Sequence, residues 1–293
     1  MRTDAGPRRR ALAAGGAAVA ALGAAVGVAS LTGTDQTDAA PPAGATFVRA
    51  ESDGGVWVVT RSDGTTLTVD PDLDGAEAPG LSPDGRWLSY ARGPEPARIL
   101  TLYLLRSDQT EPRAASRVAA TQGFAHQWSP DSALVLVPVA DGDVNLVDTA
   151  TSLVGHWGAP GTPTGFVDDD SLGWLRSQGE RGDAGLTWVV TDLETTPERS
   201  LRLQVDRGTL DPAGSPHLML RQASLSPDGS RVAALLANHR GQARVLVFST
   251  DAGELLERRD PTGTEVVLDC PFRWESGSAV LPRHGEGCVV EPG

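Results

Sequence analysis

The tetrapeptide Ser-Pro-Asp-Gly occurs twice in the chain, at Ser82–Gly85 and Ser226–Gly229, with a near copy at Ser129–Ser132. Each copy lies between two short apolar runs. Ser suits the first position of a type I turn, Pro presets the backbone at the second, and Gly is favoured at the fourth. The repeat therefore predicts a recurring tight turn between two strands. A recurring unit constrains the fold more than any other feature does.

Aligning the chain on these turns indicates a unit of four strands. Most apolar runs are short, β-branched or aromatic, and bounded by Gly, Pro, Asp or Ser, which is typical of strands. A short strand ends at the turn, and a second, a third and a more polar fourth follow. Second strands are predicted at Trp87–Ala91, Ala133–Val139 and Arg231–Leu236; third strands at Ile99–Leu105, Val144–Asp148, Leu186–Asp192 and Arg244–Ser249; fourth strands at Arg199–Gln204 and Leu255–Arg259.

Two degenerate units complete the series, with turns near Asp168 and Glu275 followed by strands at Ser171–Arg176 and Ser278–Leu281. The turns are then spaced by about 39 to 58 residues, which is close to the period of a β-propeller blade. The first unit has only its second to fourth strands, at Thr46–Ala50, Val56–Thr60 and Thr66–Val69, and the last has a third strand at Cys288–Val290. We therefore expect an all-β propeller of six four-stranded blades, or five if the two ends merge into one blade.

The segments Leu81–Tyr90 and Leu225–Ala233 resemble the repeat of TolB-type, WD40-like propellers, and Trp128–Val135 is similar with Ser132 in place of Gly. The resemblance covers roughly residues 46–292. It implies a β-propeller that acts as a protein-interaction platform in the cell envelope.

The N-terminus has the layout of an export signal. Arg8, Arg9 and Arg10 precede the uncharged, Ala-rich stretch Ala11–Leu31. A basic region followed by an apolar one indicates a signal peptide or a signal anchor, and the paired arginines leave both the general and the twin-arginine export routes open. We expect residues 1–31 to be this signal, cleaved after Ser30 or retained. Residues 32–44 would be a flexible linker, and residues 45–293 would be the propeller outside the cytoplasm.

The chain has two cysteines, Cys270 and Cys288. In an oxidising compartment an isolated pair indicates a disulfide, here one that would pin an incomplete last blade. Two buried free thiols are the alternative. A zinc site is not expected, because no Cys-x-x-Cys accompanies them.

The formal net charge is −13, and all 25 basic residues are arginine. An acidic chain does not neutralise phosphates, so we expect no nucleic-acid partner, and lysine-based chemistry is excluded. Membrane contact is expected only through the N-terminal segment, and the chain is expected to be monomeric.

The candidate metal ligands are carboxylates in turns. Asp70, Asp72 and Asp74 with Gly75 have the spacing of a calcium loop, but position 12 of that loop is Leu81 instead of an acidic residue, which favours a solvated turn. Asp168, Asp169 and Asp170 coincide with a repeat turn. His126 and His156 lie at strand edges, predicted in adjacent blades, where they could meet. We therefore predict no metal ligands and no cofactor.

No nucleophile elbow or phosphate-binding loop is present, so we predict no catalytic residues and a non-enzymatic interaction module. The alternatives are an extracytoplasmic hydrolase or lyase with its site on one propeller face, and a sensor of a small ligand or calcium. Four tryptophans are expected in the core (Trp57, Trp87, Trp174 and Trp188), whereas Trp157 and Trp274 are less constrained and Trp128 belongs to the repeat. The irregular piece Val205–Gln222 is the insertion that we expect to carry contacts.

Overall fold

The computed structural model describes residues 44–53, 56–69, 79–92, 99–119, 126–138, 143–158, 161–178, 185–194, 198–210, 218–238, 240, 242–261, 270–283, 286 and 288–290. The predicted signal and nearly all of the predicted linker lie outside these residues, as do Asp70, Asp72 and Asp74. Within the described part of the chain, no helix is long and apolar enough to cross a membrane.

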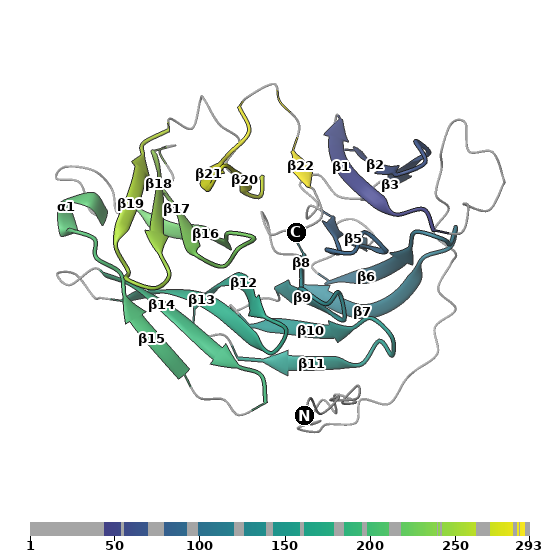
Figure 1. Cartoon of the computed structure of the whole chain (residues 1–293), viewed down its shortest axis with the longest axis horizontal. Coiled ribbons are helices and arrows are strands. Elements are labelled where there is room, and N and C mark those ends of the chain that lie inside the picture. The colour runs from purple at the N-terminus through teal and green to yellow at the C-terminus, as the bar shows by residue number, and fades with distance from the viewer. Residues whose placement is uncertain are drawn as a thin grey trace, which may run out of the picture. The chain divides into compact units, whose positions relative to one another are not determined.

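The described residues form five four-stranded antiparallel sheets and one two-stranded sheet. The sheets follow one another around a common centre, as blades of a propeller (Figure 1). Four of them are consecutive in sequence. They are blade 2 with β4 (Gly80–Leu81), β5 (Trp87–Arg92), β6 (Ile99–Arg106) and β7 (Arg113–Ala119); blade 3 with β8 (Gln127–Trp128), β9 (Leu134–Pro138), β10 (Val144–Asp148) and β11 (Val154–Trp157); blade 4 with β12 (Thr162–Asp168), β13 (Ser171–Gln178), β14 (Gly185–Asp192) and β15 (Glu198–Arg202); and blade 5 with β16 (Met219–Leu225), β17 (Arg231–Ala237), β18 (Ala243–Ser249) and β19 (Leu255–Arg259).

Blade 1 is built from both ends of the propeller. Its strands β1 (Phe47–Asp53), β2 (Val56–Arg61) and β3 (Thr66–Val69) come from the N-terminal side, and β22 (Val289–Val290) pairs with β1 as the fourth. The segment Cys288–Val290 was predicted to be the third strand of the last unit. This prediction is wrong, because the strand in this segment pairs with β1 and is the first strand of blade 1. The last unit has only the hairpin of β20 (Arg273–Glu275) and β21 (Ser278–Val280) among the described residues.

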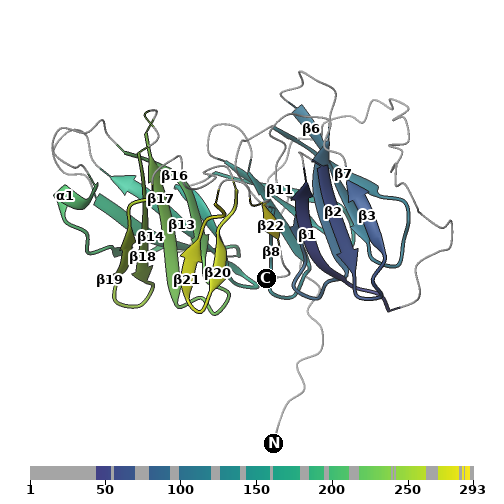
Figure 2. The same ribbon diagram turned by 90° about the horizontal axis from the view of Figure 1, so that it is seen from above.

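Among the described residues the complete blades number five, which matches the alternative blade count instead of the expected six. The described part of the last unit has two strands, and its predicted third strand pairs with blade 1. Figure 2 shows the hairpin beside blade 5, with β22 next to β1.

The core consists of five hydrophobic clusters, one at each junction between consecutive sheets from blade 1 to the hairpin. Successive side chains of a strand point to opposite faces of its sheet, so each blade contributes to the clusters on both of its sides. Strand β6 shows this, since Leu102 and Leu104 pack toward blade 3, whereas Tyr103 and Leu105 pack toward blade 1. None of these clusters joins the hairpin to blade 1 within the described residues.

The predicted irregular piece Val205–Gln222 is partly regular. It contains the short helix α1 (Arg207–Leu210), and its last residues belong to β16. The Asp206 carboxylate caps the helix by accepting hydrogen bonds from the Thr209 amide (2.8 Å) and hydroxyl (2.7 Å). These bonds lower the pKa of Asp206. The buried Arg244 guanidinium also donates to the Thr209 carbonyl, which fixes the described part of this insertion on blade 5.

Candidate functional site: the central channel and the turn face

The Ser-Pro-Asp turns share one hydrogen-bond pattern. In the turn at Ser226, the hydroxyl donates to Asp228 Oδ1 (2.6 Å) and accepts from the Arg231 amide (2.9 Å), while the Gly229 amide donates to the Ser226 carbonyl (2.8 Å). The turns at Ser82 and Ser129 repeat the pattern with equivalent residues. The recurring tight turn predicted from the sequence is confirmed.

Neighbouring turns also bond to one another. The Asp84 amide donates to Ser132 Oγ of the next blade (3.2 Å), and the Asp131 amide donates to Asp169 Oδ1 of the blade after that (2.9 Å). The Arg231 guanidinium donates to the Gly277 carbonyl in the hairpin (2.6 Å). We call the surface formed by these turns the turn face; it comprises residues 82–86, 129–133, 168–170, 226–230 and 275–277. Asp168–Asp170 thus has the structural role expected for a repeat turn.

A cavity of about 430 Å³, which we call the channel, is lined by the first strands of the blades. All five blades and the hairpin contribute to its wall, from strands β4, β8, β12, β16, β20 and β22. The lining side chains are mainly apolar or aromatic. They comprise Leu81, Pro83, Trp128, Pro130, Phe166, Ala223, Leu225, Pro227, Pro271, Phe272, Trp274, Val289 and Val290, with the polar residues His126, Gln127, Thr164, Ser224, Ser226, Gln222 and Arg273, and with Gly165.

Several polar groups of the channel wall are paired. Trp274 Nε1 donates to Ser224 Oγ (3.1 Å), which joins the hairpin to blade 5. His126 is buried, and its Nδ1 lies 3.1 Å from Ser89 Oγ. Thr164 Oγ1 has no hydrogen-bond partner within the described structure; it lies near Gly173, where a Cβ would come within 2.6 Å of it.

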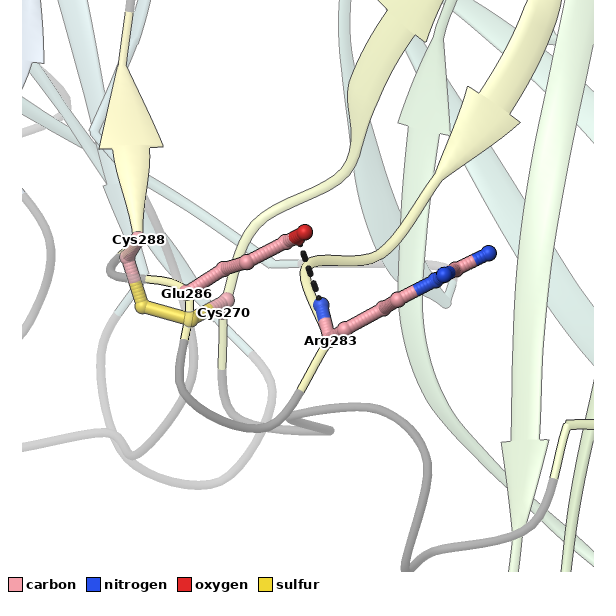
Figure 3. Close-up of a disulfide and its surroundings, with 4 residues drawn as sticks. All are labelled: Cys270, Arg283, Glu286 and Cys288. Carbon is pink, nitrogen blue, oxygen red and sulfur yellow. Dashed lines mark hydrogen bonds between the residues drawn. A yellow bond between two sulfur atoms is a disulfide. The ribbon is translucent and has the colours of Figure 1, made fainter.

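Cys270 and Cys288 form the predicted disulfide, with their Cα atoms 5.5 Å apart. Figure 3 shows the bridge between the segment that enters the hairpin and the segment that leads into β22. The Cys288 carbonyl also accepts a hydrogen bond from the Ser52 amide of β1 (2.9 Å). The disulfide therefore links the hairpin to blade 1 at the one junction that lacks a described hydrophobic cluster.

The other candidate residues are separated. His126 precedes β8, the innermost strand of blade 3, and His156 lies on β11, the outermost strand of the same blade. The expectation that they could meet is wrong, because the width of the sheet separates them. His156 bonds instead with Asp143 (3.1 Å) and Asn145 (3.3 Å). No group of three or more His, Cys, Asp or Glu side chains among the described residues is arranged to hold a metal ion.

The tryptophans divide between core and channel. Trp57, Trp174 and Trp188 are buried in the core as expected, whereas Trp87 is half-buried, with Arg106 and Arg113 over its ring. Trp128 and Trp274 line the channel, a role that the sequence did not reveal because the wall is assembled from six distant segments.

No family model matches the sequence, and no curated protein matches it. Its fold is similar to that of TolB from Acinetobacter baumannii, with a TM-score of 0.50 and 15% identity over 80% of this chain and 55% of that one. The fold is a TolB-like β-propeller. This chain thus spans about half the length of that TolB.

Weaker likenesses include hydrazine synthase from Kuenenia stuttgartiensis, with a TM-score of 0.44 and 20% identity over 70% of this chain and 54% of that one. The β-propeller domain of the Trilobed protease from Pyrococcus furiosus has a TM-score of 0.44 and 11% identity over 79% of this chain and 87% of that one.

Proposed function

We propose that this chain is a non-enzymatic interaction module, displayed outside the cytoplasm at the cell envelope, that binds a protein partner on the turn face. The observation that carries the proposal is the network of hydrogen bonds between neighbouring turns. A surface whose backbone is held by its own scaffold loses little conformational entropy on binding, which favours recognition.

The composition of the channel supports binding over acid–base chemistry. The channel wall is mainly apolar, and no Asp or Glu belongs to its described lining. Arg273, the arginine among these described lining residues, forms an ion pair with Glu275. Apolar walls with a few polar groups are typical of binding sites.

Two observations support a location outside the cytoplasm. Disulfides persist mainly in oxidising compartments, and Cys270 and Cys288 form one. The basic and apolar N-terminal sequence has the layout of an export signal. A fusion of residues 1–45 to a reporter that is active only outside the cytoplasm tests this location: activity supports it, and a reporter that stays inactive while it is expressed contradicts it.

Site-specific photo-crosslinking tests the binding face. A photoreactive phenylalanine analogue would replace Arg86, whose side chain is 75% exposed on the turn face, or Ser230, exposed on the turn face of another blade. The control position is Leu256, which is 48% exposed on the outer strand of blade 5. In envelope preparations, we expect the same protein to cross-link from both turn-face positions and not from Leu256. Equal cross-linking from all three positions, or none from the turn face, would contradict the proposal.

A further inference from the structure

Strand β11 is the outer edge of blade 3 (Figure 1), and among the described residues no strand pairs with its free side. Its pairing with β10 determines which of its backbone groups face outward. The Asp148 amide donates to the Leu153 carbonyl (3.0 Å), and every second residue of an antiparallel ladder repeats this arrangement, so Gly155 also bonds to β10. The amides and carbonyls of Val154 and His156 therefore point away from the blade.

The exposed side chains beside these outward groups are apolar. Leu153 is 60% exposed and Val154 is 43% exposed, and no other two of the exposed large hydrophobic residues in the described structure are adjacent. The exposed His156 ring is held by its own blade, because it bonds to Asp143 and to Asn145 of β10. The edge of β11 thus combines outward backbone groups with exposed apolar surface.

The outer strands of the other complete blades differ from β11. Charged side chains on an edge strand oppose pairing with another edge. Three outer strands carry such side chains, namely β7 with Arg113 and Arg117, β15 with Glu198, Arg199 and Arg202, and β19 with Glu257, Arg258 and Arg259. Strand β3 is uncharged, but its exposed residue is the polar Thr66. Among the described outer strands of the complete blades, β11 alone has no charge and an exposed apolar side chain.

The turn that leads into β11 is fixed by side chains. Asp148 Oδ1 accepts hydrogen bonds from the amides of Ala150 (2.9 Å) and Thr151 (2.7 Å). The Arg113 guanidinium of blade 2 donates to the carbonyls of Thr149 and Ala150. A strand that is held in this way loses little conformational entropy when its edge is paired.

A second copy of β11 fits this edge in an antiparallel register centred on Gly155. Val154 of each copy then lies opposite His156 of the other, and all four outward groups of each strand are hydrogen-bonded. Gly155 lies opposite Gly155 at the closest pair, where no side chain is in the way. Directly opposite residues share a face of the sheet, so each Leu153 meets the half-buried Trp157 of the other copy. The strand is therefore complementary to itself.

We propose that this chain forms a symmetric dimer in which β11 of two copies pair edge to edge and join two four-stranded blades into one sheet. The proposal differs from the monomer expected from the sequence. The contact is small, so the dimer is weak and depends on concentration, with a Kd of about 10–500 µM. This inference does not depend on a protein partner at the turn face.

Sedimentation equilibrium of the full chain tests the proposal. We expect the mass to rise from that of a monomer toward that of a dimer across this concentration range. Val154→Lys places like charges at the contact and should weaken dimerisation by at least about tenfold. Val154→Pro removes an outward amide from each copy but no bond to β10, and it should weaken the dimer as well. Thr66→Lys on the β3 edge is the matched control and should dimerise like the native chain.

A symmetric cross-link tests the register. Gly155→Cys places two thiols on opposite residues of a pair that is not hydrogen-bonded, with about 4.5 Å between Cα atoms, which suits a disulfide. Mild oxidation should give a covalent dimer of this variant and none of Thr66→Cys. Thermal melting of each variant checks folding, and Val154→Lys still tests the contact if Gly155→Cys unfolds. A monomer at every concentration, equal dimerisation of Val154→Lys and the native chain, or no cross-link in folded Gly155→Cys would overturn the proposal.

Discussion

At the scale of single residues, the serine of each repeat turn holds two segments of backbone together. Ser226 is 5% exposed, and its hydroxyl is a donor to Asp228 and an acceptor for the Arg231 amide. Replacing it leaves that amide without its side-chain partner in a largely buried place.

We expect Ser226→Ala to lower the free energy of unfolding by about 1–2 kcal/mol, because a partly buried hydrogen-bonded pair loses one member. Urea denaturation measures the change. Ser200→Ala on the exposed outer strand of blade 4 is the control and should change stability by less than about 0.5 kcal/mol. An equal effect of the two substitutions would contradict this role of the serine.

The carboxylate of the same turn predicts a pH dependence. Hydrogen bonds from the Ser226 hydroxyl, and then from the Ser230 amide and hydroxyl, lower the pKa of Asp228 from 3.8 to about 2. The native state therefore binds this proton less readily than the unfolded chain does. The resulting stabilisation is present above about pH 4 and is lost as the pH falls toward about 2.

Urea midpoints of the native chain and Asp228→Asn should accordingly differ most above pH 4 and converge as the pH falls toward 2. Asp251→Asn is the control, because among the described residues the Asp251 carboxylate accepts no hydrogen bond, while its position in an exposed turn is similar. A difference between the native chain and Asp228→Asn that stays constant from pH 5 to pH 2 would contradict the argument.

At the scale of the element, the turn at Ser129–Ser132 combines an unfavourable backbone conformation with a favourable side-chain hydrogen bond. Gly85 and Gly229 have positive φ values of 66° and 70°, and Ser132 adopts φ of 61° at the same position. A residue with a Cβ is strained there, but the Ser132 hydroxyl accepts the bond from the Asp84 amide that links two blades.

We expect Ser132→Ala to destabilise the protein, because it keeps the strain and loses the bond. Ser132→Gly loses the same bond but relieves the strain, so it should be more stable than Ser132→Ala by about 1 kcal/mol. Thermal and urea denaturation of the two variants compare them directly. If the alanine variant were equal to or more stable than the glycine variant, the left-handed turn would not be strained.

The strands that the sequence revealed are those with a strong local pattern. The second and third strands of most blades are short, mainly apolar runs beside a turn, and the predicted segments Trp87–Ala91 and Arg244–Ser249 coincide closely with β5 and β18. The outer strands β7 and β11 were not predicted, because they are short or half-exposed and carry polar residues. The strand that pairs with β22 was predicted wrongly, because pairing between two segments at opposite ends of the chain produces no pattern in the local sequence.

At the scale of the whole molecule, the ring depends on its last junction. Consecutive blades are joined by hydrophobic clusters, whereas among the described residues the hairpin meets blade 1 through a disulfide and a two-residue strand. The sequence predicted the disulfide and the propeller. It could not predict the channel, because each of the six inner strands supplies only a few residues to its wall.

Hydrogen–deuterium exchange of the closing junction tests this account most directly. In Cys270→Ser/Cys288→Ser, we expect the free energy of unfolding to fall by about 3 kcal/mol for the lost 18-residue loop. The β1 peptide includes the Ser52 amide, which donates a hydrogen bond to the Cys288 carbonyl. In the variant, this peptide should exchange faster than in the native chain, under conditions where the exchange rate of the β14 peptide is the same in both proteins. Unchanged protection of β1 in the variant would contradict a ring closed by β22 and held by the disulfide.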